Sequence, residues 1–349
     1  MKQKLTTGMK LKKIALVLLA ALIAAAMFAS CRSAGGNDTE KTAAPVDGPT
    51  SEPEDNYVLK VGALSGPTGM GMAKLISDTK EGGASAGKYD ITIYSSPDEI
   101  RAALISGSLD VAALPVNLAA VINNKTGGKY KVAAVNTLGV LYVLEAGNTV
   151  NSIADLAGKK LYATGQASTP EYILNYILQK NGLDNVEVEY KTEHSELATL
   201  LVSGQVSLGM LPEPMVTNVL SKNADVRIAL NLTEEWKKVS SGEAVQGCVS
   251  VSTDVIANHK SLLDRFLDDY KASVNFVNEH QDEAAQMIAD AGIVAAAPVA
   301  KKALPNCNIV FIDGDNMVSI LSEFYGVLFA ANPASVGGSM PGNDLYYLK

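Results

Sequence analysis

Hydrophobic and polar positions follow a pattern that occurs twice along the chain. Residues 99–117 suggest an amphipathic helix, a Ser-Gly cap, a buried strand and a Leu-Pro turn, and residues 196–214 repeat that order. The two segments align without gaps at an offset of 97 residues, with Glu, Ser-Gly and Leu-Pro at identical spacings. A repeat of this kind indicates that the chain contains two copies of one structural unit.

Matching segments surround both copies. A strand, a turn rich in small residues and a helix are predicted over 59–76 and again over 160–177, and a further strand over 132–136 and 226–231. Each half therefore has the order β-α-β-α-β, which is typical of α/β folds with a mostly parallel sheet flanked by helices. The halves are expected to form two lobes.

The chain is expected to cross between the lobes twice, through the extended segments 139–145 and 246–252. This assigns residues 57–147 and 248–349 to lobe 1 and residues 148–247 to lobe 2. A long amphipathic helix is predicted from His259 to His280, because Leu, Phe, Tyr and Val recur on one stripe.

The first 56 residues form a separate region. Five lysines precede the apolar run Ile14 to Phe28, which is too short to span a membrane, and Ala29-Ser30 precede Cys31. Residues 1–30 are therefore predicted to be a signal peptide, starting at Met1 or Met9. The Phe-Ala-Ser-Cys ending resembles a bacterial lipobox, which implies lipidation of Cys31; an ordinary secretory peptide is the alternative. Residues 31–56 are rich in Gly, Ser, Pro and acids and are interpreted as a flexible tether.

Composition narrows the class of protein. The formal net charge of −8 argues against a nucleic-acid partner, and 47% hydrophobic residues provide for a packed core. Three histidines and three cysteines leave little material for a metal site, and neither a metal nor another cofactor is expected. Whether Cys248 and Cys307 form a disulfide or remain free thiols is open at this stage.

Ligands of open α/β sheets bind beyond the carboxyl ends of the strands, and the strand-end turns of this chain have unusual sequences. Thr169-Pro170 fits an N-cap followed by the first helical position, and amides at strand ends fix ligand polarity. Methionine at such a position is more often core than ligand contact. The candidate ligand-binding residues are Ser65, Thr68, Met70, Asn117, Asn136, Gln166, Ser168, Thr169 and Glu213.

The charges of these turns favour one class of ligand. Residues 64–70, 114–118, 136–139, 164–171 and 211–215 contain no Lys or Arg, and they contain Glu171 and Glu213. A site for sulfonate or phosphate would normally use Arg. The hypothesis is therefore a neutral or weakly cationic organic ligand, such as a nitrogen heterocycle, whose N–H donates to Glu213; a solvated turn carboxylate is the alternative.

No catalytic motif is complete. The Gly-Ala-Ser-Ala-Gly run around Ser85 has the letters of a nucleophile elbow but no preceding strand, and Lys74 stands where a dinucleotide fingerprint needs glycine. His194 has no second His or Cys nearby and is interpreted as a surface histidine. The chain is therefore not expected to be an enzyme.

Several pieces in one order carry a family resemblance: the lipobox, the Ser-Gly-Pro-Thr turn at 65–68, Ser-Gly-Ser-Leu-Asp-Val-Ala at 106–112, Ile-Ala-Asp-Leu-Ala-Gly-Lys-Lys at 153–160, and Pro-Glu-Pro at 212–214. From residue 57 to the C-terminus the chain resembles solute-binding lipoproteins of ABC importers, in the branch for nitrate, taurine, other sulfonates and thiamine-pyrimidine precursors. The resemblance implies a type II periplasmic binding protein fold with a ligand cleft between the two lobes.

The same resemblance implies a function. Such a protein captures a small molecule by lobe closure and delivers it to a membrane permease with a cytoplasmic ATPase. The chain would act as a monomer, lipid-anchored outside the cytoplasm, and perform no chemistry. The ligand, the permease and the membrane stay open. Two alternatives remain: an adhesive or structural surface lipoprotein, and an enzyme of the related pyrimidine-synthase branch, whose cysteine-rich motif is missing from this sequence.

Overall fold

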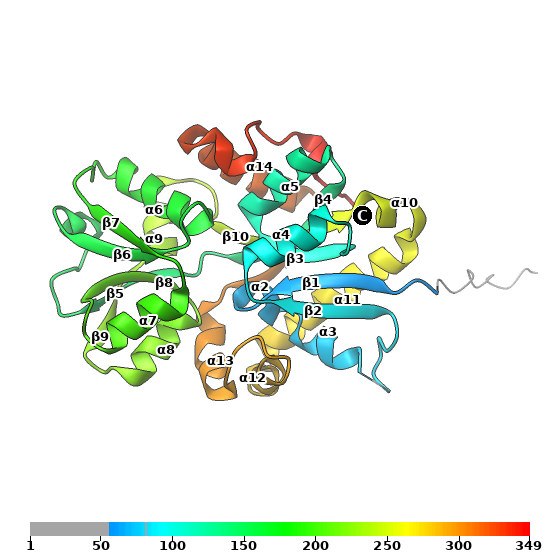
Figure 1. Cartoon of the computed structure of the whole chain (residues 1–349), viewed down its shortest axis with the longest axis horizontal. Coiled ribbons are helices and arrows are strands. Elements are labelled where there is room, and N and C mark those ends of the chain that lie inside the picture. Colours follow the sequence, from blue (N-terminus) through cyan, green and yellow to red (C-terminus); the bar gives the residue numbers. More distant parts are fainter. Residues whose placement is uncertain (1–55, 81) are drawn as a thin grey trace, which may run out of the picture. The chain divides into compact units, whose positions relative to one another are not determined.

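The computed structural model describes residues 56–80 and 82–349 (Figure 1). Residues 54–349 form one compact unit. The predicted signal peptide, the lipidation site Cys31 and the tether lie outside the described residues, apart from Asn56 at the end of the tether. Of the helices within the described ranges, none is long and apolar enough to cross a membrane.

The strands form two mixed sheets. The first has six strands in the order β11-β4-β10-β3-β1-β2. Its strands are β1 (Leu59–Leu64), β2 (Tyr89–Tyr94), β3 (Val111–Pro115), β4 (Tyr130–Leu138), β10 (Val245–Ser252) and β11 (Ile309–Ile312). The second has five in the order β7-β6-β8-β5-β9. Its strands are β5 (Leu141–Ala146), β6 (Lys160–Thr164), β7 (Glu187–Lys191), β8 (Leu208–Pro212) and β9 (Val226–Asn231).

The two sheets repeat one topology. Strand β1 runs parallel to β2 and β3, and β6 runs parallel to β7 and β8. An antiparallel strand, β10 or β5, lies beside the parallel group of each sheet, and the edge strand β11 of the first sheet is antiparallel to β4 as well. The duplication inferred from the sequence therefore describes the arrangement of the strands, with β4 and β9 as the last strand of each copy.

Each sheet is mostly parallel, as expected, and each also contains an antiparallel strand because the two lobes exchange one strand. The chain leaves the first sheet at the end of β4, passes through Gly139 and Val140, and enters the second sheet as β5, which must run back from the shared edge. Strand β10 makes the return. The sequence assigned residues 141–147 to lobe 1 and the segment after 246 to a crossing, whereas β5 pairs within the second sheet and β10 within the first. The linking segments are thus 139–140 and 240–244.

Helices cover both sheets. They are α2 (Pro67–Met70), α3 (Ala73–Asp78), α4 (Pro97–Ile105), α5 (Val116–Thr126), α6 (Thr169–Lys180), α7 (His194–Val202), α8 (Met215–Lys222), α9 (Leu232–Val239), α10 (Thr253–Asn258), α11 (Lys260–Glu279), α12 (Gln281–Asp290), α13 (Ala297–Ala303) and α14 (Gly314–Ala331). Short 3-10 turns are η1 (Ile153–Leu156), η2 (Leu304–Asn306), η3 (Pro333–Val336) and η4 (Asn343–Leu345).

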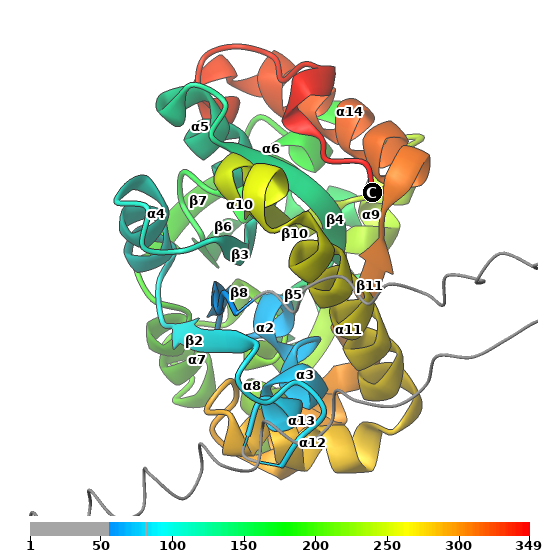
Figure 2. The ribbon, with the colours of Figure 1, turned by 90° about the vertical axis from the view of Figure 1, so that its right-hand side faces the viewer.

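The predicted helix from His259 to His280 is confirmed as α11, with these two histidines at its caps. Its apolar stripe is buried against the first sheet, because Leu263, Phe266 and Tyr270 are fully shielded from solvent. Figure 2 shows α11 running beside β10 and β11, with α5 and α14 on the other side of the sheet. The first sheet is thus covered on both faces, as a hydrophobic strand sequence requires.

A core runs from one lobe into the other. One cluster of buried residues includes Leu114 and Phe324 of the first lobe together with Leu161 and Trp236 of the second. Helices also join the two lobes. Helix α13 of the first lobe packs against α8 of the second, and α14 packs against α6. The lobes are therefore in contact in this structure.

The two remaining cysteines are free and buried. Burial raises the pKa of both thiols, Cys248 and Cys307. This settles the open alternative in favour of unpaired thiols, which behave as small hydrophobic side chains.

Candidate functional site

The carboxyl ends of the parallel strands of both sheets meet the linking segments at one edge. In the first sheet Pro115, the last residue of β3, lies opposite Gly247 near the start of β10. In the second, Pro212 at the end of β8 lies opposite Leu141 at the start of β5. We call this region, where the strand ends of both lobes lie, the strand-end edge.

A hydrogen bond crosses between the lobes at this edge. The Thr169 hydroxyl in the first turn of α6 donates to Asn117 Oδ1 in the first turn of α5 at 3.0 Å. Thr169 is fully buried, and Asn117 is 6% exposed. The structure therefore brings together two of the residues proposed from sequence that lie 52 positions apart in the chain. The Asn117 amide nitrogen has no partner among the described residues.

A second hydrogen bond also joins the lobes. The Tyr142 hydroxyl at the start of β5 donates to the backbone carbonyl of Asn306 at 3.3 Å. Burial and the nearby carboxylate of Glu213 raise the pKa of Tyr142 to about 12. Tyr142 is therefore a neutral hydrogen-bond donor at physiological pH. Sequence patterns did not indicate it, because a tyrosine in a buried strand is ordinary core composition.

Asn136 is held by the scaffold of the first lobe. Its amide nitrogen donates to the backbone carbonyl of Thr68 at 3.3 Å and to the Tyr270 hydroxyl at 3.1 Å. Its amide oxygen accepts from Thr137 at 3.2 Å. A Cβ atom at Gly247 would lie 2.5 Å from that oxygen, so this position has room only for glycine. Asn136 and Thr68 thus fix the turn after β1 against β4 and β10.

The other candidates of the first lobe differ in exposure. Met70 is fully buried, with its sulfur 3.8 Å from Cys307 Sγ, so it belongs to the core of the first lobe. Ser65 is exposed, and its backbone nitrogen donates to the Tyr94 carbonyl at 3.0 Å. In the turn after β1, Ser65 is therefore exposed to solvent, whereas Met70 is part of the hydrophobic core.

The turn before α6 differs from the sequence expectation by one residue. Ser168 is the N-cap, and Thr169 and Pro170 are the first two helical residues. The Ser168 side chain makes no capping hydrogen bond, and the exposed Gln166 precedes it. The assignment of Thr169 as N-cap was wrong because its hydroxyl bonds to Asn117 across the lobes instead of capping its own helix.

Glu213 is a buried carboxylate, only 1% exposed. Its oxygens accept from the backbone nitrogen and the hydroxyl of Thr217, each at 3.0 Å, which caps the first turn of α8. Burial raises the pKa of Glu213, while the hydrogen bonds from Thr217 and Asn306 oppose that shift. Glu213 is thus neither solvated nor idle: it caps a helix at the strand-end edge.

His194 is exposed, which agrees with its interpretation as a surface histidine, and it has one defined contact. It is the first residue of α7, and its Nδ1 lies 2.7 Å from the hydroxyl of Thr164, the last residue of β6. Nearby protein partly desolvates the ring and lowers its pKa, while the residue as a whole is exposed. The repeat offset could have located it, because His194 stands at the position of Pro97, the first residue of α4.

The nucleophile-elbow reading of Ser85 finds no support. Ser85 is 3% exposed, and its hydroxyl donates to Asp269 at 3.1 Å, as does that of Tyr89 at 2.8 Å. These bonds tie the loop before β2 to α11. Within residues 56–80 and 82–349, no group of three or more His, Cys, Asp or Glu side chains could hold a metal ion.

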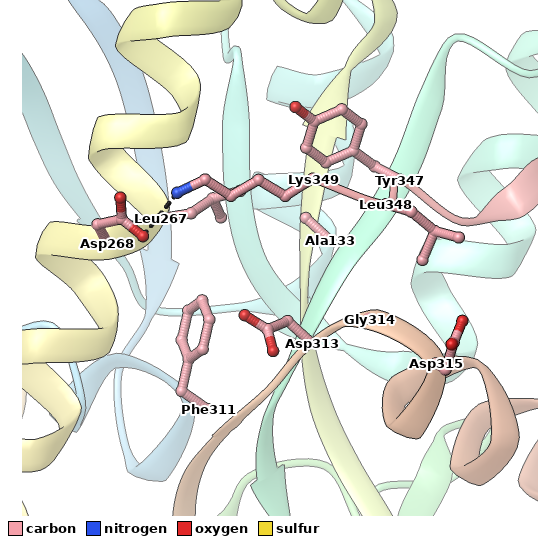
Figure 3. A pocket seen from close by; sticks show the side chains of 10 residues that line it. All are labelled: Ala133, Leu267, Asp268, Phe311, Asp313, Gly314, Asp315, Tyr347, Leu348 and Lys349. Atoms are coloured by element: carbon pink, nitrogen blue, oxygen red, sulfur yellow. Dashed lines mark ion pairs between the residues drawn. The ribbon is translucent and has the colours of Figure 1, made fainter.

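Two cavities lie away from the core of this edge. One of about 420 Å³ is lined by the C-terminal residues, Phe311 and three aspartates, and Lys349 forms an ion pair of 2.6 Å with Asp268 there (Figure 3). None of the nine candidate residues lines it. The other, of about 630 Å³, follows the outer side of α6 from Ala167 and Glu171 to the end of α14. It borders the turn before α6 without including Thr169 or Asn117.

Comparisons with known proteins agree with this geometry. Residues 84–304 match the family model described as "ABC transporter, phosphonate, periplasmic substrate-binding protein". An ABC transporter structure from Parabacteroides distasonis is 25% identical, with a TM-score of 0.72, covering 84% of this chain and 100% of that one. No curated protein sequence matches the chain.

Two further solved structures share the fold. The aliphatic sulphonate binding protein SsuA from Escherichia coli is 15% identical, with a TM-score of 0.66, and covers 83% of this chain and 92% of its own. The nitrate-binding protein NrtA from Synechocystis is 13% identical, with a TM-score of 0.56, and covers 82% of this chain and 86% of its own. The architecture is that of type II periplasmic binding proteins.

Proposed function

Because the chain belongs to the periplasmic substrate-binding proteins of ABC transporters, we propose that its solute binds at the strand-end edge between the two lobes. The chain is the substrate-binding component of an import system for small solutes and acts outside the cytoplasm. The family consists of binding components rather than enzymes, so the pyrimidine-synthase alternative no longer applies.

The observation that carries the proposal is the hydrogen bond between Thr169 and Asn117. It links the first turn of α5, which follows β3 in one lobe, to the first turn of α6, which follows β6 in the other, and ligands of open α/β sheets bind beyond such strand ends. A solute bound there would contact both lobes at once and hold them together. Of the nine candidate residues, the buried polar ones are Asn117, Asn136, Thr169 and Glu213, and two of these form this contact.

The charge of the edge supports a neutral or weakly cationic solute. Its turns carry no Lys or Arg, whereas Glu213 is buried among them. A phosphonate or sulfonate would lose its hydration without gaining a cationic partner, which is unfavourable in a buried site. We therefore place the cargo in the thiamine-pyrimidine-precursor branch of the family rather than among oxyanions, with a ring N–H donating to a Glu213 oxygen beside its Thr217 bonds.

Thermal unfolding of residues 54–349 tests this proposal, because a ligand that binds only the folded state raises the unfolding midpoint. The panel contains sulfonates, a phosphonate, nitrate, pyrimidines, thiamine, riboflavin and amino acids. We expect a pyrimidine-type compound to raise the midpoint and oxyanions to have no effect. A shift with only a sulfonate or phosphonate would overturn the charge argument.

A pair of variants connects the ligand with Glu213. Glu213→Gln is expected to weaken binding of the active compound markedly, because the buried carboxylate loses an acceptor atom. Glu187→Gln is the control, because this carboxylate is exposed on β7 and pairs with Lys160 at 3.0 Å. Equal affinities of the two variants would remove Glu213 from the site.

The attachment to a membrane is part of the proposal. The mature chain would begin at a lipidated Cys31, act as a monomer and be held outside the cytoplasm by its lipid. Mass spectrometry of the full chain expressed in a bacterium should show the added lipid, and Cys31→Ser should lose both the lipid and membrane association. An unmodified Cys31 would leave an ordinary secreted protein.

A further inference from the structure

The strand-end edge contains a buried donor with no role in the scaffold. The amide nitrogen of Gln246 is shielded from solvent and has no hydrogen-bond partner in the described part of the chain. Buried amides are nearly always paired, since an unpaired one loses its hydration without compensation. The described residues offer this nitrogen no compensation for its lost hydration, so a partner from outside the chain would satisfy it.

The register places Gln246 at the proposed site. It precedes Gly247, which lies opposite Pro115 of β3 and Thr137 of β4, so it stands at the edge where the strands of the first sheet end. The register of β10 against β4 is irregular here, and the flanking residues Val245 and Cys248 both belong to the buried cluster that contains side chains of α5 and α14. Helix α5 packs on β10 and carries Asn117 in its first turn.

Three other buried polar side-chain atoms of the described residues also lack a partner. Ser250 is farther along β10 from the edge, Thr233 lies against Gly139 in a linking segment, and Tyr190 belongs to the edge strand β7. Of the four, Gln246 is the one next to the end of β3, because it precedes Gly247, whose partner Pro115 lies two residues before Asn117 in the chain. The position of Gln246 at the strand-end edge, together with its unpaired amide nitrogen, favours a contact with the solute.

We propose that Gln246 contacts the solute, its amide nitrogen donating a hydrogen bond to an acceptor atom of the cargo beside the Asn117–Thr169 pair. This rests on the proposed function and deepens it: the cargo must carry a lone-pair acceptor, a carbonyl oxygen or an aromatic ring nitrogen, on the side that faces β10. Glu213 of the second lobe would accept a hydrogen bond from an N–H of the solute. The site would thus recognise a donor on one side of the solute and an acceptor on the other.

Four variants of residues 54–349 test the proposal. Gln246→Met keeps the length of the side chain and removes the donor, and Gln246→Glu replaces the donor by an acceptor. The matched controls are Gln205→Met and Gln205→Glu, at an exposed position between α7 and β8. The readouts are the unfolding midpoint without ligand and the affinity for whichever panel compound raises the wild-type midpoint.

We expect Gln246→Met to raise the ligand-free midpoint by a few degrees, because an unpaired buried amide is removed. The same change should weaken binding about tenfold or more, and Gln246→Glu should weaken it further by setting two acceptors against each other. Both Gln205 variants should match the wild type. Unchanged affinity in the Gln246 variants, while the wild type binds, would overturn the proposal and leave the proposed function standing.

The ligand-free midpoint decides the case in which no compound binds the wild type. That outcome contradicts the proposed ligand class, yet it does not touch the comparison between Gln246→Met and Gln205→Met. A lower midpoint for Gln246→Met would show that the amide stabilises the fold, and would overturn the assignment of Gln246 to the solute. A higher midpoint supports it.

Discussion

The two copies of the Leu-Pro turn show how a repeat diverges at the proposed ligand site. In the first, Pro115-Val116-Asn117 ends β3, and in the second, Pro212-Glu213-Pro214 ends β8 at the same offset. Val116 and Glu213 occupy equivalent positions and are both buried. The backbone and the burial are therefore common to both copies, while one places an apolar side chain and the other a carboxylate in the same surroundings.

The polar partners differ accordingly. In the first copy, Asn117 accepts a hydrogen bond from Thr169 of the other lobe. In the second copy, Glu213 accepts one from Thr217 in the helix that follows it. A fold needs a strand end and a helix start at these places, but it does not need an amide in one copy and an acid in the other. What the copies do not share is therefore the best guide to what the site recognises.

The largest effect is expected from making the copies alike. Glu213→Val introduces the residue of the first copy and leaves the buried backbone nitrogen and hydroxyl of Thr217 without their acceptor. We expect a loss of about 1–3 kcal/mol in the free energy of unfolding, and a midpoint lowered by about 2–4 °C for each kcal/mol. Urea titration measures it.

The control for that substitution is Glu187→Val at an exposed position of β7. Its effect should stay within about 0.5 kcal/mol, as for most surface changes. If both variants lost the same stability, the burial of Glu213 would not matter, and the contrast between the two turns would have no energetic meaning.

The contact across the lobes should show a smaller effect. Removing both partners in Asn117→Ala and Thr169→Val, singly and together, forms a double-mutant cycle. We expect a coupling free energy of about 0.5–1.5 kcal/mol in the unfolding of residues 54–349, typical of a neutral hydrogen bond. Strictly additive single effects would mean that this bond does not hold the lobes together.

The dependence of stability on pH should separate two buried carboxylates. Burial raises the pKa of Glu213 above its ordinary 4.5. Its contribution to the free energy of unfolding is therefore fully present below pH 4.5 and is lost as pH rises through the raised pKa. Burial also raises that of Glu145, but bonds from Thr149, Val150 and Arg227 outweigh burial and lower its pKa. Its contribution is present above pH 4.5 and is lost as pH falls through the lowered value.

Urea midpoints of the wild type, Glu213→Gln and Glu145→Gln, taken from roughly pH 3.5 to pH 8, measure these slopes. Glu213→Gln should flatten the decline towards neutral pH, and Glu145→Gln should flatten the decline towards acid. Identical profiles for the three proteins would contradict the electrostatic difference between the two sites.

The smallest effect is expected at Ser168. Its side chain makes no capping bond, so Ser168→Ala should change the free energy of unfolding by less than about 0.5 kcal/mol. Ser96→Ala should lose about 1 kcal/mol, because Ser96 forms a full capping box with Glu99. A large loss at Ser168, measured by urea titration, would assign its hydroxyl to the scaffold rather than to the surface of the site.

Sequence patterns could predict the repeated α/β unit and α11, because both depend on periodic burial and on caps with fixed spacing. They could not predict that β5 and β10 are exchanged between the sheets, because an extended apolar segment fits a link and a central strand equally well. The antiparallel strands β5 and β10 follow from that exchange, and so does the difference in the lobe boundaries.

The candidate residues also divide into those that the sequence could place and those whose role needed the structure. Strand-end position was enough to find Asn117 and Thr169, which the structure brings together. It could not separate them from Asn136 or Met70, whose partners come from Tyr270 and Cys307, far away in sequence. Gln246 was not found, because a glutamine at the start of a strand gives no pattern until its lack of partners is seen.

The most direct measurement is hydrogen exchange of residues 54–349 with and without the compound that raises the unfolding midpoint, followed by mass spectrometry. We expect added protection at the strand-end edge in both lobes, over 65–70, 115–117, 165–169 and 212–217. Protection confined to the C-terminal cavity around Lys349, or to the outer groove of α6, would contradict the claim that the solute binds where the strand ends of the two lobes lie.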